Sequence, residues 1–345
     1  MKQNIVPSKL INNQKIILTL AILSILASIF SACFIESKEQ VLFTQGNSIY
    51  LIDSDGNNLK KLVSKSPNSS PSWSPKYDEI LFILNANTIA TVHRDKLDEI
   101  QIFEGFKQGL EISDLQWSPN ANYISFNANN NIHIYDINST EEVLLLQGYS
   151  YHDWSRDSEW IAISSSDSDS GGIIQRNPLG VNELKKTKDP THFSPKWSPR
   201  NEKIAFLKPD EGVNHLYLLD VEKKNASTEP VLLHKHLTSG TTYSWSPNGK
   251  FIAFTSANNQ ENNDEIYIIN IETFQKDRLT INSNKSDRNP VWSPDGSRIA
   301  FISSQQESNL NNIFAAYTMN VDGTKQEKLT EYALTNQTLS WYAHS

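Results

Sequence analysis

The sequence contains a single cysteine, Cys33, among 345 residues. One cysteine excludes an internal disulfide and a zinc site built from several cysteines. Charged residues make up only 20% of the chain, and the formal net charge is -8. Residues 1–32 contain three lysines and no acid, so the remainder carries a formal charge of -11. Such an acidic body is a poor partner for nucleic acid, and we expect no nucleic-acid binding.

The N-terminus has the order of a secretory signal. Residues 1–15 carry the three lysines, residues 16–29 are apolar, and Phe30-Ser31-Ala32-Cys33 follows. The last four residues resemble a bacterial lipobox, in which small residues precede a cysteine that is acylated and becomes the new N-terminus. Phe30 stands where that family usually has leucine. The resemblance implies a signal peptide over residues 1–32 and a lipidated Cys33, followed by a short tether to residue 40.

An uncleaved signal anchor is the alternative reading of this segment. Residues 16–35 form a stretch of about 20 mostly apolar residues, which is long enough to span a bilayer. Both readings export the C-terminal body. We therefore expect a protein held at the bacterial cell envelope, on its periplasmic or extracellular face, through a membrane anchor at Cys33.

Tryptophan marks an internal repeat. One unit begins at Trp245 and continues with a turn at Ser246–Gly249, a β-rich run at Phe251–Phe254, an alternating run at Ile266–Ile269 and a closing Leu279-Thr280. Seven of the eight tryptophans start related segments, with spacings of 44, 37, 43, 48, 47 and 49 residues: Trp73, Trp117, Trp154, Trp197, Trp245, Trp292 and Trp341.

A repeat of about 45 residues and four strands predicts an all-β fold, a β-propeller. The Gly-His and Trp-Asp signature of WD40 repeats is missing. The pattern Trp-Ser-Pro-Asp-Gly-x-x-Ile-Ala-Phe resembles the TolB-like, or PD40, repeat, a WD40-like propeller repeat. The resemblance covers about residues 41–345 and implies the fold, but it carries no function with it.

The two ends of the repeat region predict how the ring closes. Residues 41–43, 49–52 and 59–62 read as the last three strands of a unit that lacks its tryptophan strand. Trp341 reads as a tryptophan strand without the other three. Joined, they make one composite blade, so residues 41–345 are expected to form seven four-stranded blades, with six or eight if a weak unit is misread.

Most conspicuous side chains have a structural interpretation. The seven repeated tryptophans are predicted to form the core between blades, and the serine after each one to belong to a turn. Asp53–Gly56 and Asp167–Gly171 resemble the start of calcium loops but lack the later glutamate, so we expect hairpin turns. His234 and His236 share a strand face and are expected at a solvated strand end. We predict no metal site and no cofactor.

Catalytic machinery is not recognisable in the sequence. No Gly-x-Ser-x-Gly motif occurs, and no histidine or acid recurs with the repeat. We therefore expect a non-catalytic lipoprotein whose propeller binds a protein or glycan partner, through residues that the sequence does not identify. The alternative is a propeller enzyme or ligand sensor that acts on a glycan or lactone in the central channel, which would require acids or histidines from several blades to converge.

Overall fold

The described part of the chain folds into β-strands joined by turns. The computed structural model describes residues 39–64, 71–103, 110–167, 171–180, 182–221, 229–238, 240, 242–258, 263–282, 285–305, 313–330 and 339–342. These residues belong to one compact unit, Glu39–Ala343. Cys33 and the predicted signal peptide lie outside them. Within the described ranges, no helix is long and apolar enough to cross a membrane.

The strands follow one another in groups of four, which we call units. The first half contains β1 (Gln40–Gln45), β2 (Ser48–Asp53), β3 (Lys60–Ser64), β4 (Ser72–Trp73), β5 (Glu79–Leu84), β6 (Thr88–His93), β7 (Lys96–Ile102), β8 (Ile112–Trp117), β9 (Tyr123–Ala128), β10 (Asn131–Asp136), β11 (Glu142–Gln147), β12 (Tyr149–Trp154), β13 (Ile161–Ser165), β14 (Gly172–Arg176) and β15 (Glu183–Lys185). The second half contains β16 (Phe193–Trp197), β17 (Lys203–Asp210), β18 (Val213–Asp220), β19 (Val231–Leu237), β20 (Tyr243–Trp245), β21 (Phe251–Asn258), β22 (Asn263–Asn270), β23 (Lys276–Arg278), β24 (Lys285–Trp292), β25 (Arg298–Gln305), β26 (Ile313–Asn320), β27 (Glu327–Lys328) and β28 (Leu339–Tyr342).

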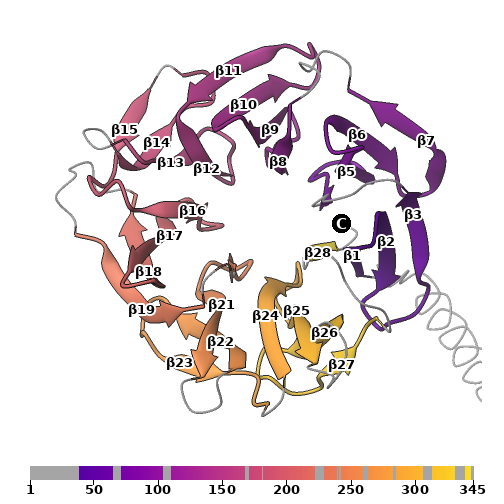
Figure 1. Cartoon of the computed structure of the whole chain (residues 1–345), viewed down its shortest axis with the longest axis vertical. Coiled ribbons are helices and arrows are strands. Elements are labelled where there is room, and N and C mark those ends of the chain that lie inside the picture. Colours follow the sequence, from indigo (N-terminus) through magenta and orange to yellow (C-terminus); the bar gives the residue numbers. More distant parts are fainter. Residues whose placement is uncertain are drawn as a thin grey trace, which may run out of the picture. The chain divides into compact units, whose positions relative to one another are not determined.

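These strands form a β-propeller, as predicted. Figure 1 shows the sheets arranged around a ring, with β8, β12, β16, β24 and β28 on its inner side and β7, β11, β15, β19, β23 and β27 on its outer side. Five sheets are four-stranded, and β16 to β23 form a sixth, eight-stranded sheet. The expectation of seven separate four-stranded sheets is therefore not met, because Leu237 of β19 pairs with Ser256 of β21 and joins two units.

The ring closes between the two ends of the described chain. β28 pairs antiparallel with β1, with Trp341 opposite Val41 and Leu339 opposite Phe43. The resulting sheet has the order β28-β1-β2-β3, so the predicted composite closure is confirmed. Pairing the two ends removes strand edges that would otherwise be open to other chains.

The tryptophans lie where neighbouring units pack face to face. Trp292, for example, shares a buried cluster with Ile266 and Ile268 of the preceding unit and with Phe301 of its own. Trp73, Trp117, Trp154, Trp197, Trp292 and Trp341 are between 5% and 8% exposed. Trp245 is only partly buried at the edge of its cluster. Each unit thus depends on its neighbour for its core, as repeat architectures do.

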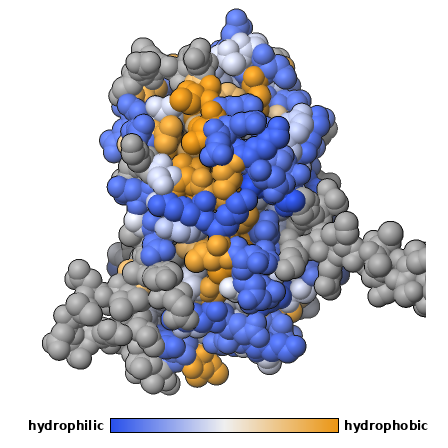
Figure 2. All heavy atoms as spheres, turned by 90° about the vertical axis from the view of Figure 1, so that its right-hand side faces the viewer, coloured by the Kyte–Doolittle hydropathy of each residue, from blue (hydrophilic) through white to orange (hydrophobic). Residues whose placement is uncertain are grey.

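One outer side of the ring is partly apolar. Figure 2 views the side that carries β3 and β7, and hydrophobic side chains gather there between hydrophilic ones. Ile100 and Ile102 of β7 are 39% and 54% exposed, and Leu59 just before β3 is 47% exposed. β7 is also the terminal strand of its sheet, so exposed apolar side chains and an unpaired strand edge occur together there.

Candidate functional site

The connectors from the outer strand of one unit to the inner strand of the next share a backbone plan. In the connector after β23, the Leu279 N–H donates to the Ile266 carbonyl at 2.8 Å, and the Thr280 hydroxyl accepts from the Ile266 N–H at 3.0 Å. The segment after β27 repeats both bonds with Leu329, Thr330 and Ala316. A leucine-threonine pair therefore holds each connector against the third strand of its unit.

The connector after β15 keeps this plan but replaces the leucine by a lysine. The Lys186 N–H donates to the Ile173 carbonyl at 2.8 Å, and the Thr187 hydroxyl accepts from the Ile173 N–H at 2.8 Å. Lys186 is only 9% exposed, and its ammonium group donates to the Val221 carbonyl at 3.1 Å. Burial lowers the pKa of Lys186, although nearby Asp220 opposes the shift. A cation thus occupies a position that the repeat reserves for an apolar side chain.

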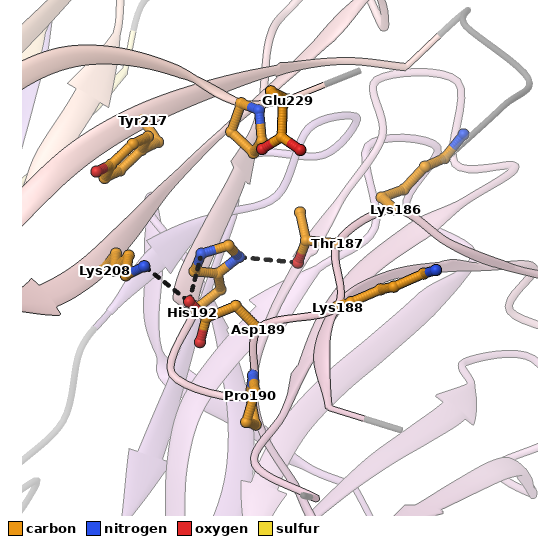
Figure 3. A pocket seen from close by; sticks show the side chains of 10 residues that line it. Lys186, Thr187, Lys188, Asp189, Pro190, His192, Lys208, Tyr217 and Glu229 are labelled. Carbon is orange, nitrogen blue, oxygen red and sulfur yellow. Dashed lines mark hydrogen bonds and ion pairs between the residues drawn. The ribbon is translucent and has the colours of Figure 1, made fainter. Parts of the chain in front are cut away.

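A polar cavity of about 620 Å³ opens beside this connector. Figure 3 shows the side chains that converge on it from the connector, β17, β18 and the segment before β19. We call it the junction pocket; it is lined by Lys186, Thr187, Lys188, Asp189, Pro190, His192, Lys208, Tyr217, Glu229 and Pro230. Three ammonium groups and two carboxylates border it, so it suits a ligand that carries both charged and hydrogen-bonding groups.

His192, at 7% exposure, is held on both ring nitrogens. Its Nδ1 lies 2.9 Å from the Thr187 hydroxyl, and its Nε2 lies 3.4 Å from Asp189 Oδ2 (Figure 3). Burial lowers the pKa of His192, with Asp189 opposing the shift, so the ring is neutral at pH 7. Because the Thr187 oxygen already accepts from a backbone N–H, its proton is free to go to Nδ1, which leaves the ring proton on Nε2.

Thr187, His192 and Asp189 are linked in the order of the nucleophile, base and acid of a catalytic triad, but their contacts do not suit its chemistry. The Thr187 hydroxyl, which would be the nucleophile, is 6% exposed, and its oxygen is engaged by the backbone. A nucleophile must be accessible, and its base must be free to take its proton. The contacts of Thr187 and His192 therefore indicate a structural role for both.

An ion pair forms one wall of the junction pocket. Lys208 Nζ lies 2.8 Å from Asp189 Oδ2, and the Thr191 hydroxyl donates to Asp189 Oδ1 at 2.6 Å. Burial by itself would raise the pKa of Asp189, but the Lys208 and Thr191 hydrogen bonds outweigh it and hold the pKa well below the usual range. Asp189 is therefore a fixed anion that orients the Lys208 ammonium group.

The junction between β23 and β24 contains a network of buried polar side chains. Glu265 is fully buried, forms an ion pair with Arg278 at 2.9 Å, and accepts hydrogen bonds from the Thr280 hydroxyl and the Asn282 N–H. Asp287 is 1% exposed, and burial raises its pKa to about 6, although hydrogen bonds from Ser303 and Thr280 oppose the shift. These groups bind one another, so they leave little for an external ligand.

The inner strands also bring titratable side chains together. His152 of β12 lies with Nδ1 3.3 Å from Asp114 Oδ2 of β8. Asp153 accepts the Trp197 N–H at 2.7 Å, and burial raises the pKa of Asp153 to about 7, with Lys196 and that N–H opposing the shift. Acids, a histidine and a lysine from three neighbouring units therefore do meet on the inner side of the ring, which the sequence did not reveal.

The other residues singled out in the sequence have local roles. The serine after each of the first six repeated tryptophans is buried; Ser293, for example, accepts from the Arg298 N–H at 2.9 Å and donates to Asp295. His234 bonds to Ser256, and His236 lies beside His215, with ring centroids 5.5 Å apart. Across the described ranges, no group of three or more histidine, cysteine or acidic side chains is arranged to hold a metal ion.

The two Asp-rich turns are only partly described. Asp53 is 3% exposed and accepts hydrogen bonds from Gln40 and Asn58, so its carboxylate holds the turn after β2 in place. In the second turn, Asp167 and Gly171 are joined by a backbone hydrogen bond of 2.6 Å, and residues 168–170 lie outside the described residues. Cys33 also lies outside them.

Comparison with known proteins agrees with the propeller and its repeat type. Residues 179–344 match the TolB β-propeller domain family, and residues 71–152 match the WD40 domain family of anaphase-promoting complex subunit 4. Residues 179–344 therefore resemble TolB-like β-propeller repeats, as the tryptophan pattern indicates. No curated protein sequence matches the chain.

Solved structures share the fold at low sequence identity. A TolB protein from Agrobacterium tumefaciens is 19% identical, with a TM-score of 0.51, and the match covers 70% of this chain and 87% of that one. TolB from Acinetobacter baumannii is 16% identical, with a TM-score of 0.51 over 88% and 66% of the two chains. Oligogalacturonate lyase from Vibrio parahaemolyticus is 13% identical, with a TM-score of 0.60 over 87% and 90%. Such similarity is one of architecture.

Proposed function

We propose that this chain is a non-catalytic, membrane-anchored lipoprotein whose propeller binds a protein or glycan partner at the bacterial cell envelope. The junction pocket is the observation that carries the proposal. It is an open cavity with charged groups of both signs, and its histidine has a partner on each ring nitrogen. A preformed cavity with a few fixed polar groups supports binding, because such groups orient a ligand without reacting with it.

The anchor at the N-terminus is part of this proposal. Residues 1–32 act as a signal peptide, and Cys33 takes the lipid that holds the propeller at the periplasmic or extracellular side of a membrane. Cys33→Ser should abolish incorporation of a labelled fatty acid and leave the precursor unprocessed. Unchanged labelling of this variant would show that Cys33 is not the site of lipidation.

We also propose that each unit of four strands is one blade, which gives seven blades. β19 and β21 are joined at a single pair of residues, Leu237 and Ser256, whereas β17 and β18 pair along eight. β16 and β20 each end in their own repeat tryptophan. A crystal structure in which β19 and β21 separate would support seven blades, and a continuous ladder between them would contradict it.

The charges around the junction pocket indicate which ligands to test first. Lys188 is exposed at the rim, and Lys208 is held by Asp189. Ammonium groups pair with a ligand carboxylate, while Asp189 and Glu229 accept hydrogen bonds from hydroxyl groups. An acidic oligosaccharide offers both, and the fold neighbour from Vibrio parahaemolyticus, an oligogalacturonate lyase, makes oligogalacturonate the first probe.

The test measures binding of oligogalacturonate to the full-length protein in detergent by titration calorimetry. Lys188→Glu should weaken binding about tenfold or more, because it replaces an attractive charge by a repulsive one. The matched control is Lys276→Glu, since Lys276 lies over the Tyr267 ring in another unit and does not line the pocket. Equal weakening by both variants, or none by either, would remove the junction pocket from the proposed function.

A catalytic role of the inner strands is the second candidate. Burial raises the pKa of Asp153 to about 7, and the partly exposed carboxylate of Asp114 belongs to the neighbouring unit. A pair of carboxyl groups in different environments is typical of general acid and base catalysis on glycans. If the protein cleaves oligogalacturonate or a lactone, Asp153→Asn should abolish product formation. Binding without turnover by the parent protein would favour the non-catalytic role.

A further inference from the structure

Two aromatic side chains from neighbouring units meet on the inner strands β12 and β16. Tyr151 of β12 is 42% exposed, and Phe193 of β16 is partly buried. Their ring centroids are 5.5 Å apart, with the planes tilted by 51°. Both strands lie on the inner side of the ring (Figure 1). Phe193 also packs against a buried core cluster, so Tyr151 is the ring of this pair that presents an exposed face to a ligand.

The backbone of the inner strands β8, β12 and β16 is irregular a few residues before the tryptophan. The residue three before the tryptophan is Asp114, Tyr151 and Ser194 in turn. Asp114 and Ser194 have positive φ, +48° and +51°, and the pairing register of all three inner strands shifts near these residues. Bulges re-aim side chains and often accompany functional sites. Asn289 of β24, also three before its tryptophan, has a φ of +55° and the same shift as Asp114 and Ser194, whereas the shift in β12 comes earlier, between Tyr149 and Tyr151. Tyr151 is therefore the side chain whose placement departs from this plan.

In these three units the residue one before the tryptophan is polar and is held by the next unit (Gln116, Asp153 and Lys196). Gln116 donates to the His152 carbonyl at 3.1 Å, and Lys196 donates to the Tyr243 carbonyl at 2.9 Å. Asp153 accepts a backbone N–H in the same manner. These side chains are partly exposed, so they keep surface for a ligand while the neighbouring backbone fixes their positions.

We propose that the inner-strand surface formed by β8, β12 and β16 is a saccharide-binding platform. A pyranose ring stacks its apolar C–H face on the Tyr151 ring, which Phe193 supports from the next unit, and its hydroxyl groups bond to Asp114, Asp153 and Lys196. This inference rests on the proposed binding function and assigns a glycan, rather than a protein, as the partner. It uses none of the residues that line the junction pocket.

The chemistry of the platform favours an uncharged sugar chain. Carboxyl and ammonium groups flank the aromatic pair and largely offset one another, so a charged ligand gains little there. Hydroxyl groups both donate and accept, and they therefore match a mixture of carboxyl and ammonium partners. A β-1,4-linked chain with equatorial hydroxyls leaves the flat faces of its rings apolar, as stacking on an aromatic side chain requires.

The experiment titrates full-length protein in detergent with two hexasaccharides, one of β-1,4-linked glucose and one of β-1,4-linked N-acetylglucosamine. At least one should bind. Tyr151→Ala should weaken that binding about tenfold, whereas Tyr151→Phe, which keeps the ring, should stay within about twofold of the parent. Tyr77→Ala is the matched control, because Tyr77 is 48% exposed on a turn away from the inner strands. It should leave binding unchanged.

Three outcomes would overturn the platform: neither hexasaccharide binds, Tyr151→Ala binds as well as the parent, or Tyr77→Ala weakens binding as much as Tyr151→Ala. Failure of the platform is distinguishable from failure of the proposed function. Ligand binding that is lost in Lys188→Glu and kept in Tyr151→Ala retains the junction pocket and removes the platform. A captured protein partner that depends on Tyr151, without any saccharide binding, would replace the glycan by a protein.

Discussion

The junction between β15 and β16 and the junction between β23 and β24 share a backbone and differ in chemistry. In each, a threonine hydroxyl accepts the N–H of an isoleucine on the third strand. The difference begins at the residue before that isoleucine, which is Gly172 in the first junction and Glu265 in the second. The Glu265 carboxylate accepts the hydrogen bond that the Thr280 hydroxyl donates. Gly172 has no side chain that could accept this bond, so the Thr187 hydroxyl bonds to His192 instead.

Gly172 cannot be replaced without moving the connector. Its φ is +119°, and a Cβ there would lie 2.6 Å from the Thr187 carbonyl oxygen. The missing side chain lets the first connector approach the third strand closely and leaves His192 to complete the hydrogen bonds. The second junction is instead filled by Glu265 and its partners. The repeat therefore determines the backbone of both junctions. A few exceptional residues determine whether the polar groups there line a cavity, as in the junction pocket, or bind one another, as around Glu265.

Replacing the tryptophan that follows each junction tests whether both junctions rest on the same scaffold. Trp197→Ala and Trp292→Ala should each lower the free energy of unfolding by about 3–5 kcal/mol, because both rings are 5–8% exposed and fill the space between units. Urea unfolding of both variants measures this. A difference of more than about 2 kcal/mol between them would contradict a common scaffold.

Two carboxyl groups with raised pKa values predict a fall of stability with rising pH. Burial raises the pKa of Asp153 to about 7 and that of Asp287 to about 6, whereas an unfolded aspartate has a pKa of about 3.9. Each group stabilises the fold fully below about pH 3.9, and this contribution is lost as the pH rises through the folded pKa, about 4 kcal/mol for Asp153 and about 3 kcal/mol for Asp287.

Urea unfolding between pH 4 and pH 8 measures this loss. Asp287→Asn should remove the part between about pH 4 and 6, and Asp153→Asn should remove the part that extends to about pH 7. Two variants with the pH dependence of the parent would show that neither carboxyl group holds its proton in the folded state.

The ion pairs of the two junctions should differ in strength. Arg278→Met leaves the fully buried Glu265 carboxylate without its cation and should cost about 2–3 kcal/mol. Lys208→Met removes the partner of Asp189, which is 31% exposed, and should cost less than about 1 kcal/mol because water replaces the contact. Thermal melts of both variants, with Lys250→Met as a surface control, decide the order. Equal costs would mean that the second junction is more hydrated than its burial indicates.

A substitution of Lys186 is expected to have the smallest effect on stability. Lys186→Leu restores the leucine found at the equivalent positions 279 and 329, and removes an ammonium group that is costly to bury. We expect the free energy of unfolding to rise by about 1 kcal/mol and ligand binding at the junction pocket to weaken. A destabilised variant would show that the Lys186–Val221 hydrogen bond contributes more than burial of its charge costs.

The repeated tryptophans made the propeller and the composite closure predictable, because a period of about 45 residues with four short strands has few other solutions. Lys186 could also have been found by aligning the units, since it breaks the leucine-threonine pair. The eight-stranded sheet could not be predicted, because it depends on one long-range pairing between Leu237 and Ser256. The acids on the inner strands could not be predicted either, because Asp114 and Asp153 do not recur at one repeat position.

The sequence by itself determined the repeat, the strand pattern and the buried positions, because local turn chemistry and alternation of apolar residues act within each unit. Only the tertiary structure decided which polar residues meet. His192 and Asp189 face Lys208 of the next unit, and Tyr151 faces Phe193, because neighbouring units pack at a fixed register around the ring. Contacts between units join residues tens of positions apart, and no local pattern records them.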